Sequence, residues 1–191
     1  MLKFVDKKMY WRGEDAGILQ LIPKKDWWHI KTIQDVVTIY ELMGTEGKVI
    51  GEIGGSDSRT AEYLSKENTV FNIEAILRNT GSISKDSFKS LKLGEVNNVI
   101  AKIGDFEKHL PDEHFDLLYS ISVLEHVANA NIETMKNFWK DCHRLLKPGG
   151  RMVHLIDIYV FDDLEENKPS EEKLHKYLTV FDLGFRPATS E

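Results

Sequence analysis

The chain has 191 residues, of which 41% are hydrophobic and 29% charged, a balance typical of one soluble globular domain with a sizeable core. A net charge of −6 gives no overall attraction to nucleic acid or to an anionic membrane, so we expect neither as a partner. Cys142 is the only cysteine, which excludes an internal disulfide and a cysteine zinc cluster and fits a cytoplasmic location.

Residues 1–30 combine aromatic side chains with several helix breakers, so we expect an irregular N-terminal arm. Its aromatic residues favour packing on the domain surface, with a lid over a ligand as the alternative. From Ile30 to Met43 the apolar residues recur at helical spacing, and Gly44 ends the predicted helix. We therefore divide the chain into an arm or lid, 1–30, and a ligand-binding domain, 31–191.

The rest of the chain alternates between short apolar runs, typical of strands, and stretches with helical spacing. Strands are predicted at 48–53, 69–73, 96–103, 115–120 and 151–158, and helices at 58–66 and 132–146. Cys142 belongs to the apolar stripe of the last helix and is expected in the core. The segment 147–150 is predicted to end that helix and turn the chain. This order predicts an α/β fold, a three-layer sandwich with a mostly parallel central sheet.

A glycine turn separates the first strand from its helix, with the sequence Glu52-Ile53-Gly54-Gly55-Ser56. Glycine lets the backbone bend sharply and lets a ligand approach it closely. The N–H groups of the following helix attract acceptor atoms. The acid before the glycine pair differs from the dinucleotide fingerprint G-x-G-x-x-G. The turn is thus a candidate nucleoside-binding loop, although a turn that only reverses the chain has a similar pattern.

Acidic residues follow the second and third strands at the same predicted edge of the sheet, where open parallel sheets bind ligands. Glu74, with Ala75 beside it, is placed to accept hydrogen bonds from both hydroxyls of a ribose. Asp105 is placed to accept one from an adenine amino group. Phe106 or Ile76 is placed to cover the adenine ring. These side chains together favour a nucleoside ligand over a dinucleotide.

Residues 48–157 resemble class I S-adenosylmethionine (SAM) methyltransferases over their whole length. The glycine turn resembles motif I of that family, with Ser56 and Ser58 in place of its second and third glycines. Two further segments carry the most specific resemblance, namely 115–127 and 145–151. The resemblance implies SAM as cofactor and methyl transfer to a small acceptor. The cofactor-binding residues that it implies are Glu52, Ile53, Gly54, Gly55, Ser56, Glu74, Ala75, Asp105, Phe106 and Ser120.

A catalytic base would lie beyond the fourth and fifth strands, beside the methyl group. His126 is the first candidate because histidine titrates near neutrality, and its alternative role is a hydrogen bond to nearby backbone. Asp157 is the second candidate. Side-chain alternation along the strand puts His154 on the face opposite Asp157. A metal-binding pair is therefore not expected, and we predict no metal requirement.

Three functional hypotheses follow from these residues. The first is a SAM-dependent methyltransferase, for which we expect a hydroxyl oxygen on a sugar or other metabolite as acceptor. The second is an inactive, methyltransferase-like binding or scaffold subunit, which the serines of the glycine turn favour. The third is a nicotinamide-dependent oxidoreductase, which the missing fingerprint disfavours.

The tail after the fifth strand departs from this family. Only residues 180–185 are strand-like there, whereas the family continues with a helix and an antiparallel hairpin. We expect that either the chain is a fragment of a longer protein or its sheet is unusually short. An unpaired sheet edge invites pairing with a second copy, so a homodimer is expected.

Overall fold

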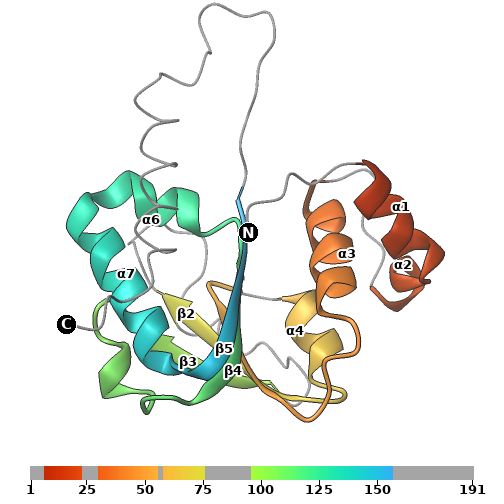
Figure 1. The fold of residues 1–191 in the computed structure, drawn as a ribbon. Helices are drawn as coiled ribbons and strands as arrows, with labels where there is room; N and C mark the ends of the chain where they lie inside the picture. Colours follow the sequence, from red (N-terminus) through yellow and green to blue (C-terminus); the bar gives the residue numbers. More distant parts are fainter. Residues whose placement is uncertain (1–6, 23–29, 56–57, 76–95, 157–191) are drawn as a thin grey trace, which may run out of the picture.

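The sheet at the centre of the molecule has five strands, all parallel, in the order β3-β2-β1-β4-β5. The computed structural model describes residues 7–22, 30–55, 58–75 and 96–156. The strands are β1 (Val49–Ile53), β2 (Thr69–Ala75), β3 (Asn97–Ala101), β4 (Phe115–Ile121) and β5 (Leu146–Leu155). Helices cover both faces of the sheet (Figure 1). The predicted three-layer α/β sandwich is therefore confirmed.

One face of the sheet is covered by α6 (Leu124–Ala130) and α7 (Ile132–Leu145), as Figure 1 shows. The apolar stripe of α7 explains this packing, because Met135, Phe138 and Cys142 are buried in the core cluster beneath it. Burial raises the pKa of the Cys142 thiol well above its usual value. The thiol is thus protonated and inert, and its predicted place in the core is confirmed.

The opposite face is covered by α3 (Ile30–Leu42) and α4 (Arg59–Leu64). Here Leu42 and Leu64 pack against Ile50 of β1 and Tyr119 of β4. The two faces follow from side-chain alternation along each strand, which sends neighbouring residues to opposite layers. The result is that both faces of β1 and β4 are buried, and the free edge at their carboxyl ends is where a ligand can enter.

The N-terminal segment differs from the irregular arm that its glycines predict. It forms α1 (Lys7–Asp15) and α2 (Ile18–Leu21), which pack on the outer side of α3 (Figure 1). A Cβ atom on Gly13 would lie 2.4 Å from Val36 Cγ1 of α3, so this glycine permits the close approach of α1. Tertiary packing outweighs the helix-breaking tendency of Gly13. The lid role stays a prediction.

The start of β5 also differs from prediction. The segment 147–150, predicted as a turn, lies inside the strand as an irregularity of its ladder with β4. Phe115 pairs with Leu146 and Leu117 with Arg151, so β5 uses more residues than β4 over the same span. Such a bulge places extra, unpaired residues in one strand, after which regular pairing with the neighbouring strand resumes.

Several predicted features lie outside the described residues. They are Ser56, Ile76, Asp157 and the tail after the fifth strand. Within the described part of the chain, no helix combines the length and the apolar character needed to cross a membrane.

Candidate active site at the carboxyl ends of the strands

The glycine turn after β1 is packed so closely that neither glycine has room for a side chain. Gly54 has φ of 72°, and its N–H donates to the Ile73 carbonyl at 2.8 Å. A Cβ atom on Gly54 would lie 2.7 Å from Val123 Cγ2, and one on Gly55 would lie 2.5 Å from Glu52 Cδ. The turn thus presents bare backbone at the sheet edge, as close approach of a ligand requires.

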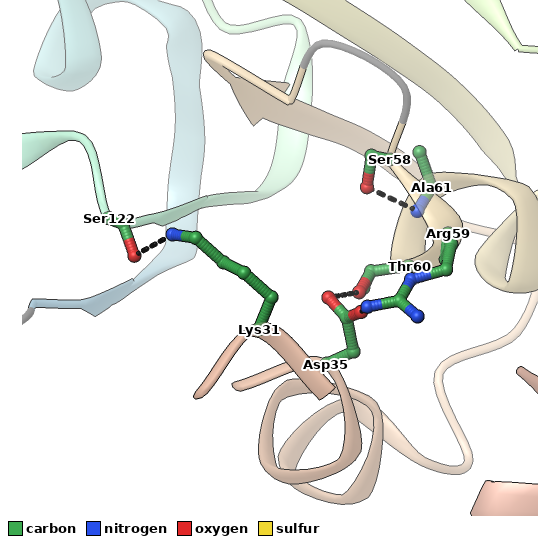
Figure 2. A network of polar contacts seen from close by, with 7 residues as sticks. All are labelled: Lys31, Asp35, Ser58, Arg59, Thr60, Ala61 and Ser122. Carbon is green, nitrogen blue, oxygen red and sulfur yellow. Dashed lines mark hydrogen bonds and ion pairs between the residues drawn. The ribbon is translucent and has the colours of Figure 1, made fainter. Parts of the chain in front are cut away.

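Ser58 starts the helix that follows this turn. Its Oγ accepts a hydrogen bond from the Ala61 N–H at 3.0 Å, which caps α4 (Figure 2). The serine that replaces the third glycine of motif I therefore has a structural role of its own. It keeps the helix N-terminus directed at the turn.

Glu52 lies beneath the glycine turn with 2% of its surface exposed. Its Oε2 accepts a hydrogen bond of 2.8 Å from the Tyr119 hydroxyl. Burial raises the pKa of Glu52 to about 7, and the charges of Asp35 and Glu74 add to this effect. Hydrogen bonds from Ser58 and Tyr119 act in the opposite direction and lower that pKa. The acid is therefore close to half protonated at neutral pH.

Glu74 lies on β2, the strand beside β1. Asn72 pairs with Glu52 in register, so Glu74 is two residues nearer the carboxyl edge of the sheet. The hydrogen bond from Gly54 to Ile73 places the turn next to this half-buried carboxylate. Glu74 and the turn are thus neighbours, as a ribose site requires.

Asp105 follows β3, next along the same edge, and precedes a short 3-10 helix, η1 (Phe106–Lys108). Its carboxylate accepts a hydrogen bond from Lys108 Nζ at 2.7 Å, and this contact lowers the pKa of Asp105. The preceding Gly104 donates its N–H to Asp141 Oδ2 of α7 at 2.5 Å. Sequence reasoning missed Asp141, which holds this corner in place.

Phe106 and Ser120 point into the core. Neither side chain has any exposed surface, and Phe106 belongs to the cluster under α7. The Ser120 Oγ lies 2.8 Å from His154 Nδ1. Neither side chain has an exposed face in this structure, and their contacts with a cofactor stay a prediction.

The N-terminal half of α3 adds polar contacts that the sequence analysis missed. Lys31 Nζ donates to Ser122 Oγ, just after β4, at 2.6 Å (Figure 2). Gln34 Nε2 donates to the same oxygen at 2.7 Å. Asp35 forms an ion pair with Arg59 at the start of α4 (Figure 2). The helix is thereby tied to both loops that border the site. In the sequence, the only sign of this role of α3 is the presence of polar residues within an otherwise apolar helix.

His126 is exposed on α6, and its N–H donates to the Val123 carbonyl at 3.0 Å. This position leaves its imidazole accessible, as a proton acceptor needs. No group of three or more His, Cys, Asp or Glu side chains that could hold a metal ion occurs among the described residues.

Comparison with known proteins identifies the fold and the family. Residues 52–154 match a family model described as a methyltransferase domain, and this match covers more than half of the chain. The protein belongs to the methyltransferase domain family. The matched region runs from the glycine turn to β5, and of the elements that border the site it leaves out α3. The resemblance seen in the sequence is confirmed.

Solved structures of methyltransferases share this architecture. A SAM-dependent methyltransferase from Aquifex aeolicus has 18% sequence identity and a TM-score of 0.56, with 96% of this chain and 90% of that chain covered. A TehB-like SAM-dependent methyltransferase from Corynebacterium glutamicum has 16% identity and a TM-score of 0.52, with 96% and 94% covered. For two other matched structures, this chain spans 49% and 64% of their length. No curated protein matches it significantly.

Proposed function

We propose that the protein transfers a methyl group from SAM to a hydroxyl oxygen on a sugar or other small metabolite. Family membership supports methyl transfer and SAM as the methyl donor. The observation that carries the proposal is the glycine turn between Glu52 and Glu74, where Val123 and Glu52 leave Gly54 and Gly55 no room for a side chain of their own. These residues fit a nucleoside cofactor.

SAM, when bound, supplies a methyl group on a sulfonium that is ready for displacement. The chain then has to hold the nucleoside and orient the acceptor. Glu74 accepts the ribose hydroxyls, and the backbone at Gly54 and Gly55 allows close approach. Asp105, at the end of the next strand, would accept a hydrogen bond from the adenine amino group.

The acceptor is assigned to the side of the site formed by α6 and the start of α3. His126 is exposed there and is the candidate base for a hydroxyl proton, with Asp157 as the second candidate. The net charge of −6 supports a small molecule rather than nucleic acid as acceptor. A cytoplasmic location and a homodimer remain predictions.

The cofactor assignment is tested by calorimetry with SAM. Glu74→Ala should weaken binding, because it removes charge-assisted hydrogen bonds of roughly 1.5–3 kcal/mol each at most. The matched control is Glu67→Ala, an exposed acid at the opposite end of β2, which should leave the affinity unchanged. Equal affinity in the Glu74→Ala variant and the wild type would reject the ribose assignment.

Turnover then tests the acceptor side. With a hydroxylated acceptor in hand, His126→Ala or Asp157→Asn should lose activity while SAM affinity stays at the wild-type level. His143→Ala, an exposed histidine in the last turn of α7, is the control. Full activity in both variants would mean that proximity alone drives transfer or that another residue is the base. Tight SAM binding with no transfer to any acceptor would favour the inactive binding subunit.

A further inference from the structure

Tyr119 of β4 is buried without any exposed surface, yet its hydroxyl meets the acid of the neighbouring strand. Glu52 and Tyr119 are register partners in the β1–β4 ladder, and the phenol donates to Glu52 Oε2 at 2.8 Å. Ser58, at the start of α4, is a second hydrogen-bonding partner of the same carboxyl group. Side chains from β4 and from the start of α4 therefore converge on one buried acid of β1.

The oxygen that Tyr119 holds also supports the glycine turn. A Cβ atom on Gly55 would lie 2.7 Å from Glu52 Oε2 and 2.5 Å from Glu52 Cδ. The backbone of Gly55 therefore rests on the carboxyl group that Tyr119 fixes. A change in the position or the charge of that group is transmitted directly to the turn.

We propose that Tyr119 is a positioning residue for SAM: its hydroxyl fixes the Glu52 carboxyl group beneath the glycine turn and couples SAM affinity to the charge of that group. This inference rests on the proposed function, because it takes SAM as the ligand of the turn.

The surroundings of Glu52 set the direction of this coupling. Burial is the main cause of its raised pKa of about 7, and Asp35 of α3 and Glu74 of β2 raise it further. Asp35 is itself paired with Arg59 of α4. The phenol of Tyr119 has a pKa raised well above its usual value, so it remains a donor at neutral pH. SAM carries a net positive charge, and an ionised Glu52 favours it.

The test is calorimetry of SAM binding from about pH 5.5 to about pH 8.5. In the wild type the affinity should rise about fivefold or more as the pH passes through the pKa of Glu52. Glu52→Gln should abolish this step. Tyr119→Phe removes a donor that favours the ionised acid, so the step should move to higher pH. Tyr63→Phe, which changes a partly buried tyrosine of α4, should keep the wild-type profile.

The outcomes separate this inference from the proposed function. Failure of the wild type to bind SAM at any pH would overturn both. Binding that is independent of pH, or a Tyr119→Phe profile identical to that of the wild type, would overturn the role of Tyr119 alone.

Infrared spectroscopy covers the case in which Tyr119→Phe does not fold. Addition of SAM to the wild type near neutral pH should reduce the carboxylic-acid band, because binding favours the ionised acid. That change should be missing in Glu52→Gln. An unchanged band in the wild type would overturn the coupling.

Discussion

Gly54 and Gly44 have nearly the same backbone conformation, with φ of 72° and 74°, but different surroundings. A Cβ atom on Gly44 meets nothing within 4 Å, whereas one on Gly54 meets Val123 Cγ2 at 2.7 Å. Gly44→Ala should cost about 1–2 kcal/mol of unfolding free energy through the left-handed backbone alone. Gly54→Ala should cost about 1–3 kcal/mol more, because overpacking is added.

Urea denaturation of both variants measures this difference. The double variant Gly54→Ala/Val123→Ala should recover part of the additional loss, because the truncated valine makes room. Equal losses for Gly44→Ala and Gly54→Ala would show that backbone strain alone makes glycine necessary in the turn.

At the same scale, some site residues could be predicted from local sequence and others could not. Glu52 and Glu74 follow recognisable strands, so their place at the sheet edge is a local property. The bond from Tyr119 to Glu52 joins residues 67 positions apart, and the bond from Lys31 to Ser122 joins residues 91 apart. The spacing of apolar residues along the chain does not predict such pairings between distant residues. The burial of Phe106 likewise depends on α7, a helix far along the chain.

Among the elements, β4 has an acid as its second residue, and this acid ties three strands together at the end of the sheet opposite the site. Asp116 Oδ2 accepts from the Val49 N–H of β1 at 2.8 Å and from Lys147 Nζ of β5 at 2.9 Å. These contacts lower the pKa of Asp116, the backbone hydrogen bond first. Asp116, near the start of the 115–127 segment that resembles the family, therefore acts as a structural clamp between the strands.

Two variants divide the contributions of this clamp. Asp116→Ala should cost about 1–3 kcal/mol, because it leaves the Val49 N–H without its acceptor. Lys147→Met keeps the aliphatic stem and removes a half-exposed ion pair, so about 0–1 kcal/mol is expected. Denaturant melts of both variants provide the comparison. A loss in Lys147→Met as large as that in Asp116→Ala would assign the clamp to the ion pair instead.

The five strands and the helices α3, α4 and α7 agree in order and type with the pattern of apolar residues, since long amphipathic stretches and strand runs are local signals. The pattern gives no prediction for α6 or η1. The exceptions have tertiary causes. α1 forms around Gly13 because that glycine lets two helices meet. β5 begins directly after α7 because its first residue pairs with Phe115, a contact that outweighs the turn-forming Pro148 and Gly149.

For the molecule as a whole, two buried groups on opposite faces of the sheet make the free energy of unfolding vary with pH in opposite directions. His154, on the α7 side beside Trp139, has a pKa lowered to about 4 by burial. Between about pH 4 and its unfolded value of 6.5, the unfolded state binds more protons, so stability rises with pH. Glu52 has a pKa of about 7 in the folded state against 4.5 in the unfolded state, so over this interval the folded state binds more protons. The free energy of unfolding therefore falls as the pH rises from 4.5 to 7.

The two contributions are of similar size, each roughly 3 kcal/mol at full extent, so between pH 4.5 and 6.5 they should largely cancel. Unfolding free energies measured against pH test this. Relative to the wild type, Glu52→Gln should show stability that rises more steeply with pH. For His154→Gln, the free energy of unfolding should instead fall as the pH rises. Variant curves parallel to the wild type would contradict the assignment of these two groups.

The central place of β1 also governs the order of events during folding. β2 follows β1 closely along the chain, but β4, the other neighbour, brings Tyr119 from 67 residues beyond Glu52. Contacts between distant segments form slowly, because the entropy of closing the intervening loop is lost before any contact compensates it. While the chain is being synthesised, one edge of β1 stays open until β4 emerges. The residues of the glycine turn are thus synthesised early, but the contact from Tyr119 that supports the turn forms only after β4 has been synthesised.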